Sequence, residues 1–496
     1  MGLLIDRDRF TDEDFHRFDQ RLKDCLQVFA ELLGRADFGA GEPSLGAELE
    51  LSLIGSEAQP LALNREIIED TGDARLTVEL DRFNLECNLC HGPLAGRPFA
   101  ALRREIESAL VAVRRAAAAR DARAVMIGIL PTLRRDDLES SAMTETPRFR
   151  ALSTALQSRR SAPFRLDIHG QDPLQIECDD VTFEGAATSL QIHLRVAASQ
   201  FARVYNAVQL ATAPVLAASG NSPTFLGHRL WEETRVALFK QAVDDRPDAP
   251  DREGREARVS FGTGWVREGA HELFADAVAD HDPLLPILSE EDPLDRLRSG
   301  GLPALEEMRL HAGTVWRWNR PVYDPAGGGH LRIEMRALPA GPSVTDMLAN
   351  TAFLLGAALG LAPDMDAITG VLPFERVHHD FYRAAQHGLE ARLAWPIEPG
   401  GPVETLPAGE VVEKLAGVAR AGLSRFGVDP AESEPLIATV AERARSGQTG
   451  AAWQRRTLAR TESRGGRREG LRRMFEAYIE RSSQDRPVHT WGLGEA

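Results

Sequence analysis

The sequence has 496 residues, and its 58 basic side chains (Lys and Arg) against 74 acidic ones give a formal charge of −16. This acidic balance argues against a nucleic-acid-binding protein, because such proteins carry basic surfaces for phosphate. Only three of the basic residues are lysines, and none of them follows a glycine, so the Gly-Lys-Ser/Thr sequence of a Walker A phosphate loop is excluded.

Two kinds of apolar periodicity alternate along the chain. Spacings of three and four predict helices, whereas strict alternation predicts strands. In chain order, the patterns predict a helix at 10–36, strands at 47–53, 76–80 and 85–89, a helix at 99–121, strands at 124–130 and 190–196, a helix at 200–218, a strand at 330–336 and a helix at 346–361. Strands with one apolar face are typical of antiparallel sheets. The sequence therefore predicts an α+β fold, with a mostly antiparallel sheet and helices on its apolar side.

The polar faces of these strands carry an unusual set of charged side chains. They are Glu48, Glu50, Glu79, Glu86, His193, Arg332, Glu334 and Arg336. One such strand alone is most simply a solvated sheet face. Because the pattern recurs, like charges would crowd one face and need compensation by cations or arginines. Clustered carboxylates with an imidazole suit Mg²⁺ or Mn²⁺, and guanidinium groups bind phosphate bidentately. Together they predict a lysine-free way to bind ATP.

Several of these residues have simpler interpretations. His193 could be a hydrogen-bonded structural histidine, and Arg336 could merely pair with Glu334 in the sheet. Cys87 and Cys90 have the spacing of half a zinc site, but no second pair exists and they lie in strand-like sequence. We therefore interpret these two cysteines as structural.

The domain organisation is predicted from composition. A segment rich in Pro and Gly, 396–409, predicts a linker before a helical C-terminal region. We expect an N-terminal helical segment at 1–40, a catalytic α+β domain at 41–395, and the linker with its helical region at 396–496.

Targeting signals are not expected. The N-terminus becomes charged at Asp6-Arg7-Asp8, before an apolar stretch of signal-peptide length develops. The longest apolar run, 351–363, is too short to span a bilayer. We expect a soluble cytoplasmic protein with neither nucleic-acid nor membrane partners, for which a homodimer is compatible with the sequence.

Ordered motifs extend over most of the chain. They are Gly46–Glu50, the Glu79/Glu86 pair, Ile127–Pro131, Arg148-Phe149, Gln191–His193, Ala218–Pro223 with Arg235 after it, Trp318–Pro321, Arg332–Arg336 and Phe381–Glu390. Their order and spacing resemble the glutamate-cysteine ligases and related carboxylate-amine ligases of the plant and bacterial type. The resemblance covers about residues 45 to 395.

The resemblance implies a glutamine-synthetase-like catalytic core and an ATP-dependent ligase that forms γ-glutamylcysteine through γ-glutamyl phosphate, by default in glutathione biosynthesis. It implies metal binding by Glu48, Glu50, Glu79, Glu86, His193 and Glu334. Catalytic roles would fall to Arg336, Glu334 and Arg235. Nucleotide contacts would come from Arg332, Arg336, Asn221 and Arg320, the last also a candidate for the amino acid's α-carboxylate. The expected ligands are ATP, Mg²⁺ (or Mn²⁺), glutamate, and cysteine or another amine.

One departure from the family pattern bears on the substrate. Ala337-Leu338-Pro339 stands where many members carry an aspartate shortly after the Glu-x-Arg strand, so a substrate contact is expected to differ. The alternatives are a ligase with a different amine or carboxylate, a phosphotransferase acting on a nitrogen acceptor, and a non-catalytic relative that binds Mg-ATP.

Overall fold

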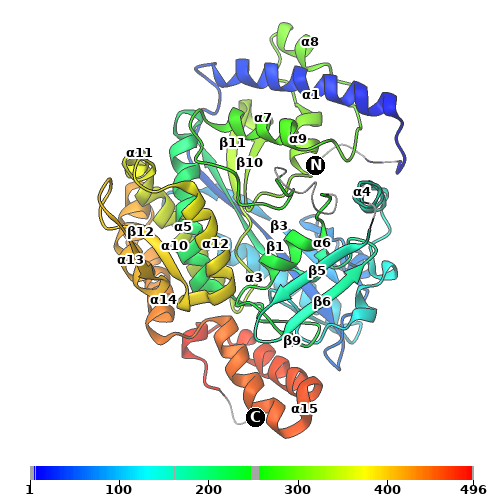
Figure 1. Cartoon of the computed structure of the whole chain (residues 1–496), viewed down its shortest axis with the longest axis vertical. Helices are drawn as coiled ribbons and strands as arrows, with labels where there is room; N and C mark the ends of the chain where they lie inside the picture. Colours follow the sequence, from blue (N-terminus) through cyan, green and yellow to red (C-terminus); the bar gives the residue numbers. More distant parts are fainter. Residues whose placement is uncertain (1–4, 6, 161, 247–255, 494–496) are drawn as a thin grey trace.

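A seven-stranded antiparallel sheet forms the centre of the computed structural model, which describes residues 5, 7–160, 162–246 and 256–493 (Figure 1). Its strand order is β10–β11–β7–β1–β3–β2, and β4 also pairs with β1. The strands are β1 (Ser44–Ile54), β2 (Leu76–Val78), β3 (Asn84–Pro93), β4 (Arg123–Val125), β7 (Leu190–Val196), β10 (Asn319–Asp324) and β11 (His330–Met335). The predicted α+β class with an antiparallel sheet is confirmed.

The strand expected at 124–130 differs most from its prediction. Only Arg123–Val125 forms β4, which pairs with Ser52–Ile54 at the end of β1. The same edge of β1 is occupied over residues 45–49 by β7. Because β7 already takes the hydrogen-bonding groups of that edge, the chain after Val125 has no strand to pair with.

Three two-stranded sheets and fifteen α-helices surround this centre within the described residues. The small sheets are β5 (Phe164–His169) with β6 (Pro173–Cys178), β8 (Thr224–Phe225) with β9 (His228–Arg229), and β12 (Arg392–Pro396) with β13 (Val403–Pro407). The helices are α1 (Asp12–Leu33), α2 (Asn64–Thr71), α3 (Pro98–Ala118), α4 (Pro147–Ser158), α5 (Phe201–Ser219), α6 (Arg235–Ala242), α7 (Ala270–Asp280), α8 (Pro293–Arg298), α9 (Glu306–Ala312), α10 (Val344–Leu361), α11 (Met365–Thr369), α12 (Phe374–His387), α13 (Ala408–Arg425), α14 (Pro430–Ser446) and α15 (Gly450–Ser483).

The apolar side of the sheet is covered by helices, as the strand patterns predict. α3 contacts β1, β3 and β4, α5 contacts β10 and β11, and α10 packs against both helices. The strand residues Leu51, Leu85 and Ile333 are completely buried. The charged side chains of the same strands therefore lie on the other face.

One helical stretch of the described chain, Val344–Thr369, is long and apolar enough by length and composition to cross a membrane. Of its most apolar 18-residue stretch, 89% is buried inside the protein. Such burial is typical of a core helix, which is apolar all round because neighbours surround it.

The first and last long helices, α1 and α15, lie at opposite ends of the molecule (Figure 1). The predicted N-terminal helix is α1, which packs with α7, α8 and α9, while α15 lies at the far end (Figure 1). Thr11 caps α1 together with Asp14 in a capping box, which fixes where this helix begins. Residues 1–4 and 6, which bear on the signal-peptide argument, lie outside the described residues.

The segment expected to be a linker belongs to a hairpin. Trp395 pairs with Glu404, so β12 and β13 enclose a turn whose Pro and Gly residues gave the linker-like composition. The C-terminal region beyond it is helical, as predicted, and α13 and α14 pack against α10 of the core.

Candidate active site

Strand register places the charged side chains opposite one another on one face of the sheet. Glu50 on β1 pairs with Glu86 on β3, and Glu334 on β11 pairs with His193 on β7. Residues that pair across neighbouring strands point to the same face. Glu48, two residues before Glu50 on β1, also shares this face. Four adjacent strands thus bring together five of the six residues that the sequence predicted as metal ligands, and the sixth, Glu79, directly follows β2.

Three carboxylates form the tightest group. Oxygen atoms of Glu50, Glu79 and Glu86 all lie within 4.8 Å of one another. Burial, followed by the charges of Glu86 and Glu50, raises the pKa of Glu79 well above its ordinary value. Burial and the nearby Glu48 and Glu50 raise the pKa of Glu86 to about 7. Such crowding is relieved by a bound cation, and three converging carboxylate oxygens suit Mg²⁺ or Mn²⁺.

A second group lies beside it, around His193. The Nε2 atom of His193 is 3.1 Å from Glu48 Oε1, and neither ring nitrogen has a well-aligned hydrogen bond within the described residues. Burial acts to raise the pKa of Glu48, but His193 and Arg336 outweigh it and lower this pKa. A buried imidazole without an aligned partner, next to an ionised carboxylate, fits a metal ligand better than a structural histidine.

Glu334 is the most deeply buried of the predicted metal ligands. It is 1% exposed and forms ion pairs with Arg336 and, at 2.6 Å, with Arg320. Burial acts to raise the pKa of Glu334, but Arg320 and Arg336 lower it far below its usual range. The two arginines therefore favour the ionised form of Glu334, and both guanidinium groups are held on the acidic face.

The arginines of β11 differ in what they contact. Besides Glu334, Arg336 donates to Gln191 Oε1 at 2.5 Å, while its Nε atom is buried with no partner within the described chain. Arg332 is 3.2 Å from Asp324. The pairing of Arg336 with Glu334 is thus present, and the Nη1 atom makes both this ion pair and the bond to Gln191.

Arg235 reaches the same region from α6. It is buried, with its Nε atom 2.7 Å from Glu233 and its Nη2 atom donating to the carbonyl of Ala337 at 2.8 Å. Burial raises the pKa of Glu50, and Arg336 and then Arg235 act to lower it. The position of Arg235 beside the carboxylate cluster is therefore fixed by its own ion pair.

Asn221 lies in the interior, with its amide fully engaged. Its Nδ2 atom donates to Ala340 O at 2.8 Å and to Tyr478 Oη at 2.9 Å, and its Oδ1 atom accepts from Gln454 Nε2 at 2.9 Å. Both donor hydrogens are used, which leaves none for a nucleotide. These bonds join Asn221 to α15 and give it a structural role, whereas the nucleotide contact stays a prediction.

The sequence motifs missed Glu184, which lies in the short helical turn Glu184–Ala186 before β7. Burial and then Glu50 raise its pKa to about 7. It lies in a connecting segment without strand alternation, so no periodicity marked it. A Cβ atom on the adjacent Gly185 would lie 2.5 Å from Asp81 Cγ, so the structure requires a glycine there, but the sequence alone does not reveal this contact.

The two cysteines of β3 do not form a metal site by themselves. Cys87 is buried and Cys90 is exposed, and both are free thiols. Strand residues three positions apart point to opposite faces, so the two sulfur atoms cannot bind one ion.

Comparison with known proteins identifies the family. The sequence model of glutamate-cysteine ligase family 2 (GCS2) matches residues 44–477. The chain belongs to this family. The resemblance drawn from the motifs is confirmed, and the GCS2 chain is an ATP-dependent carboxylate-amine ligase.

Solved structures resemble the GCS2 chain at low sequence identity. A glutamate–cysteine ligase from Francisella tularensis in complex with AMP has a TM-score of 0.51 at 10% identity, over 92% of this chain and 91% of that one. A bifunctional glutathione synthetase from Pasteurella multocida has a TM-score of 0.48 at 11% identity, over 95% and 55% of the two chains. The ligase PafA in complex with Pup has a TM-score of 0.41 at 11% identity, over 92% and 74%. The first likeness concerns the fold alone. No curated protein matches the sequence.

Proposed function

We propose that this GCS2 ligase joins the γ-carboxylate of glutamate to the amine of cysteine, converting ATP to ADP and phosphate. The observation that carries the proposal is the cluster of Glu50, Glu79 and Glu86 beside the ion pair of Glu334 and Arg336. A phosphotransfer site must neutralise several negative charges at once, and this face offers both cation ligands and fixed guanidinium groups. The AMP held by the Francisella tularensis structure, which shares the fold, supports a nucleotide site here.

The reaction proceeds in two steps. A carboxylate oxygen of glutamate attacks the γ-phosphorus of ATP, and the bond to ADP breaks. The amine nitrogen of cysteine then attacks the acyl carbon, loses its proton and displaces phosphate. Holding both reactants in line supplies much of the acceleration in such reactions.

Each group of residues has a place in this scheme. Glu50, Glu79 and Glu86 would hold Mg²⁺ or Mn²⁺, and Glu48, His193 and Glu334 offer further ligand atoms. A divalent cation held there would supply positive charge against the phosphate oxygens and the acceptor carboxylate. Arg336 would stabilise charge on the transferring phosphoryl group, because it is permanently charged and held in place by Glu334 and Gln191.

The remaining arginines would bind the ends of the substrates. Arg320, 2.6 Å from Glu334, lies at the edge of the acidic face and is our candidate for the α-carboxylate of glutamate. Arg332 would assist with the nucleotide phosphates. Arg235 would place a fixed positive charge next to Glu50 while the acyl phosphate forms.

The reaction is tested by offering Mg-ATP with glutamate and a panel of amino acids and amines, followed by ADP release and product mass. We expect ADP only when glutamate and cysteine are both present, with a product equal to their sum minus water. Another amine giving the same pattern would reassign the acceptor, which the Ala337-Leu338-Pro339 departure makes worth screening. A phosphorylated amine would instead indicate a phosphotransferase, and no ADP with any pair would indicate a non-catalytic relative.

The cation site is tested by Glu86→Gln, with Mn²⁺ binding followed by electron paramagnetic resonance in the absence of ATP. We expect Mn²⁺ affinity to fall by at least about tenfold. Even the loss of a residue that only hydrogen-bonds to a metal ligand lowers metal affinity by about this factor. Glu69→Gln, at an exposed acid of α2, is the matched control and should bind Mn²⁺ like the wild type. Equal affinity in the Glu86 variant would contradict the site.

A further inference from the structure

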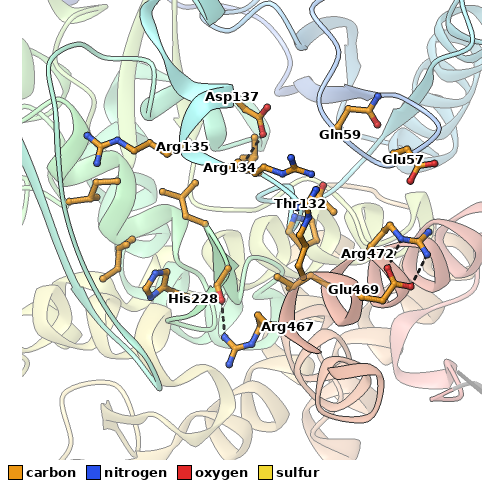
Figure 2. A pocket seen from close by; sticks show the side chains of 18 of the residues that line it. Glu57, Gln59, Thr132, Arg134, Arg135, Asp137, His228, Arg467, Glu469 and Arg472 are labelled. Carbon is orange, nitrogen blue, oxygen red and sulfur yellow. Dashed lines mark hydrogen bonds and ion pairs between the residues drawn. The ribbon is translucent and has the colours of Figure 1, made fainter. Parts of the chain in front are cut away.

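A large cavity with charged and apolar walls lies between α15 and three loops at the same end of the molecule. Its volume is about 1210 Å³. It is lined by the loop after β1, residues 131–137, β6, the turn of the β8–β9 hairpin and the middle of α15 (Figure 2). None of its lining residues belongs to the acidic face described above. The cavity is therefore formed by residues other than those of the acidic face.

The wall of this cavity is basic in an acidic protein. Five arginines, namely Arg134, Arg135, Arg467, Arg468 and Arg472, line it with only three acids, Glu57, Asp137 and Glu469. The whole chain has a charge of −16. The charge of the cavity wall is therefore opposite in sign to the net charge of the protein. Figure 2 shows Arg134 and Arg135 across the space from Arg467. Such a wall attracts anions.

Two of the arginines hold the wall together. Arg467 lies 2.7 Å from Glu462 and 3.0 Å from Asp172, and it also donates to the carbonyl of Gly227 at 2.8 Å. Arg472 lies 2.8 Å from Glu469. The bond to Gly227 joins α15 to the β8–β9 hairpin, and Arg472 pairs with Glu469, one of the three acids that line the cavity.

The other three arginines form no ion pair within the described part of the chain. Arg135 donates only to the backbone carbonyl of Glu177, at 2.9 Å. No side-chain bond joins Arg134 or Arg468 to another described residue. Asp137 already accepts from the backbone N–H of Arg134 at 2.8 Å. Three guanidinium groups around one space therefore have their forked donors available for a ligand.

The break in α15 adds to this positive field. Gly466 has φ 78° and ψ 174°, which ends the first half of the helix, and the second half begins at Arg467. The first turn of that half, residues 467–469, lines the cavity, and the N-terminal end of a helix carries partial positive charge. Leu133, Leu226 and Leu471 supply an apolar part of the wall.

We propose that this cavity binds an organic phosphate, with its phosphate groups on Arg134, Arg135 and Arg468 and its carbon skeleton against the leucines. The forked donors of a guanidinium group match the oxygen atoms of a phosphate. Three such groups carry more positive charge than one carboxylate would neutralise. The volume of the cavity leaves room for the carbon skeleton of the ligand in addition to its phosphate groups. The proposal concerns a second anion site and does not rest on the proposed substrates of the ligase.

The test is calorimetric titration of the whole protein with inorganic pyrophosphate, in the presence of a chelator so that no metal contributes. We expect the double variant Arg134→Gln/Arg468→Gln to bind pyrophosphate at least about tenfold more weakly, since two charge-assisted contacts are lost. Both side chains are exposed, so the variant should unfold at the wild-type temperature, which a thermal melt checks.

Two control variants make the result specific. Arg473→Gln removes an exposed arginine of α15 that pairs with Glu469 but does not line the cavity, and it should leave the affinity unchanged. Arg336→Gln removes an arginine of the acidic face and should also leave it unchanged. The proposal is overturned if the wild type does not bind pyrophosphate at millimolar concentration, if the double variant binds as tightly as the wild type, or if Arg336→Gln abolishes the binding.

Discussion

At the scale of single residues, burial decides what a polar side chain can do. Glu334 lies on the polar face of its strand as predicted, yet it is 1% exposed and pairs with Arg320 and Arg336. A Glu334→Gln change would therefore leave two guanidinium groups short of a partner as well as removing a metal ligand. Its loss of activity alone would not separate the two effects, and for that reason Glu86 is the better test of metal binding.

Asn221→Ala is expected to destabilise the protein rather than weaken ATP binding selectively. The change leaves the buried partners Ala340, Tyr478 and Gln454 short of a hydrogen bond. We expect the free energy of unfolding to fall by about 1–3 kcal/mol, measured by urea unfolding, with ATP affinity of the folded protein unchanged. The exposed amide of Gln484 serves as control, and Gln484→Ala should change stability by less than about 0.5 kcal/mol. Normal stability with weakened ATP binding would restore the nucleotide role of Asn221.

At the scale of elements, close helix packing joins the core to the C-terminal region. A Cβ atom on Gly422 of α13 would lie 2.1 Å from the carbonyl oxygen of Gly356 and 2.6 Å from the amide nitrogen of Gly360, both on α10. The backbones of the two helices touch at these small residues. Larger side chains would push the helices apart.

Gly422→Ala is therefore expected to lower the free energy of unfolding by about 1–3 kcal/mol or more, because backbone atoms cannot move aside for a methyl group. Gly417→Ala is the matched control, since it lies on the same helix with nothing within 4 Å of its added Cβ atom. That control should be neutral or stabilising by up to about 1 kcal/mol, as alanine favours helix. Equal thermal unfolding temperatures for the two variants would contradict the packing.

A buried histidine between α9 and α7 is expected to make the stability of the folded protein depend on pH. His311 Nε2 is 2.9 Å from Ala277 O, and burial lowers the pKa of His311 to about 4 although this hydrogen bond acts to raise it. Between about pH 6.5 and pH 4 the unfolded chain binds a proton at this residue and the folded protein does not. Stability from this group is therefore present above pH 6.5 and is lost as pH falls towards 4, by up to about 1.4 kcal/mol per pH unit.

We expect His311→Gln to show a shallower loss of stability between pH 6.5 and pH 4 than the wild type, because glutamine does not titrate. Urea unfolding at a series of pH values measures the slope. His16→Gln, at an exposed position of α1, should keep the wild-type slope. If His311→Gln also keeps that slope, the histidine is not buried in its neutral form.

At the scale of the whole molecule, the region after residue 396 completes the core. α10 is buried along almost its entire length, and α13 and α14 supply much of its cover. The family match extends to residue 477, well past the boundary that composition placed at 395. Asn221 is further held by Gln454 and Tyr478 of α15.

A chain ending at residue 396 is therefore expected to lose cooperative folding, because it exposes the apolar surface of α10 to water. Near-ultraviolet circular dichroism and binding of a hydrophobic dye report this state. Co-expression of residues 397–496 as a separate fragment should restore a soluble complex. A monomeric truncated chain with a sharp thermal transition would show that the C-terminal region is an independent unit.

Local patterns in the sequence determined the fold class and most of the candidate site. Glu48 and Glu50 could be placed on one face because a strand repeats every two residues, which needs no knowledge of its neighbours. The tertiary structure decided the rest, since only strand register sets Glu50 against Glu86 and His193 against Glu334. It also brought Glu184, from a loop without periodicity, to the carboxylates. The arginine-lined cavity joins segments more than 300 residues apart, and contacts at such separation leave no trace in local spacing.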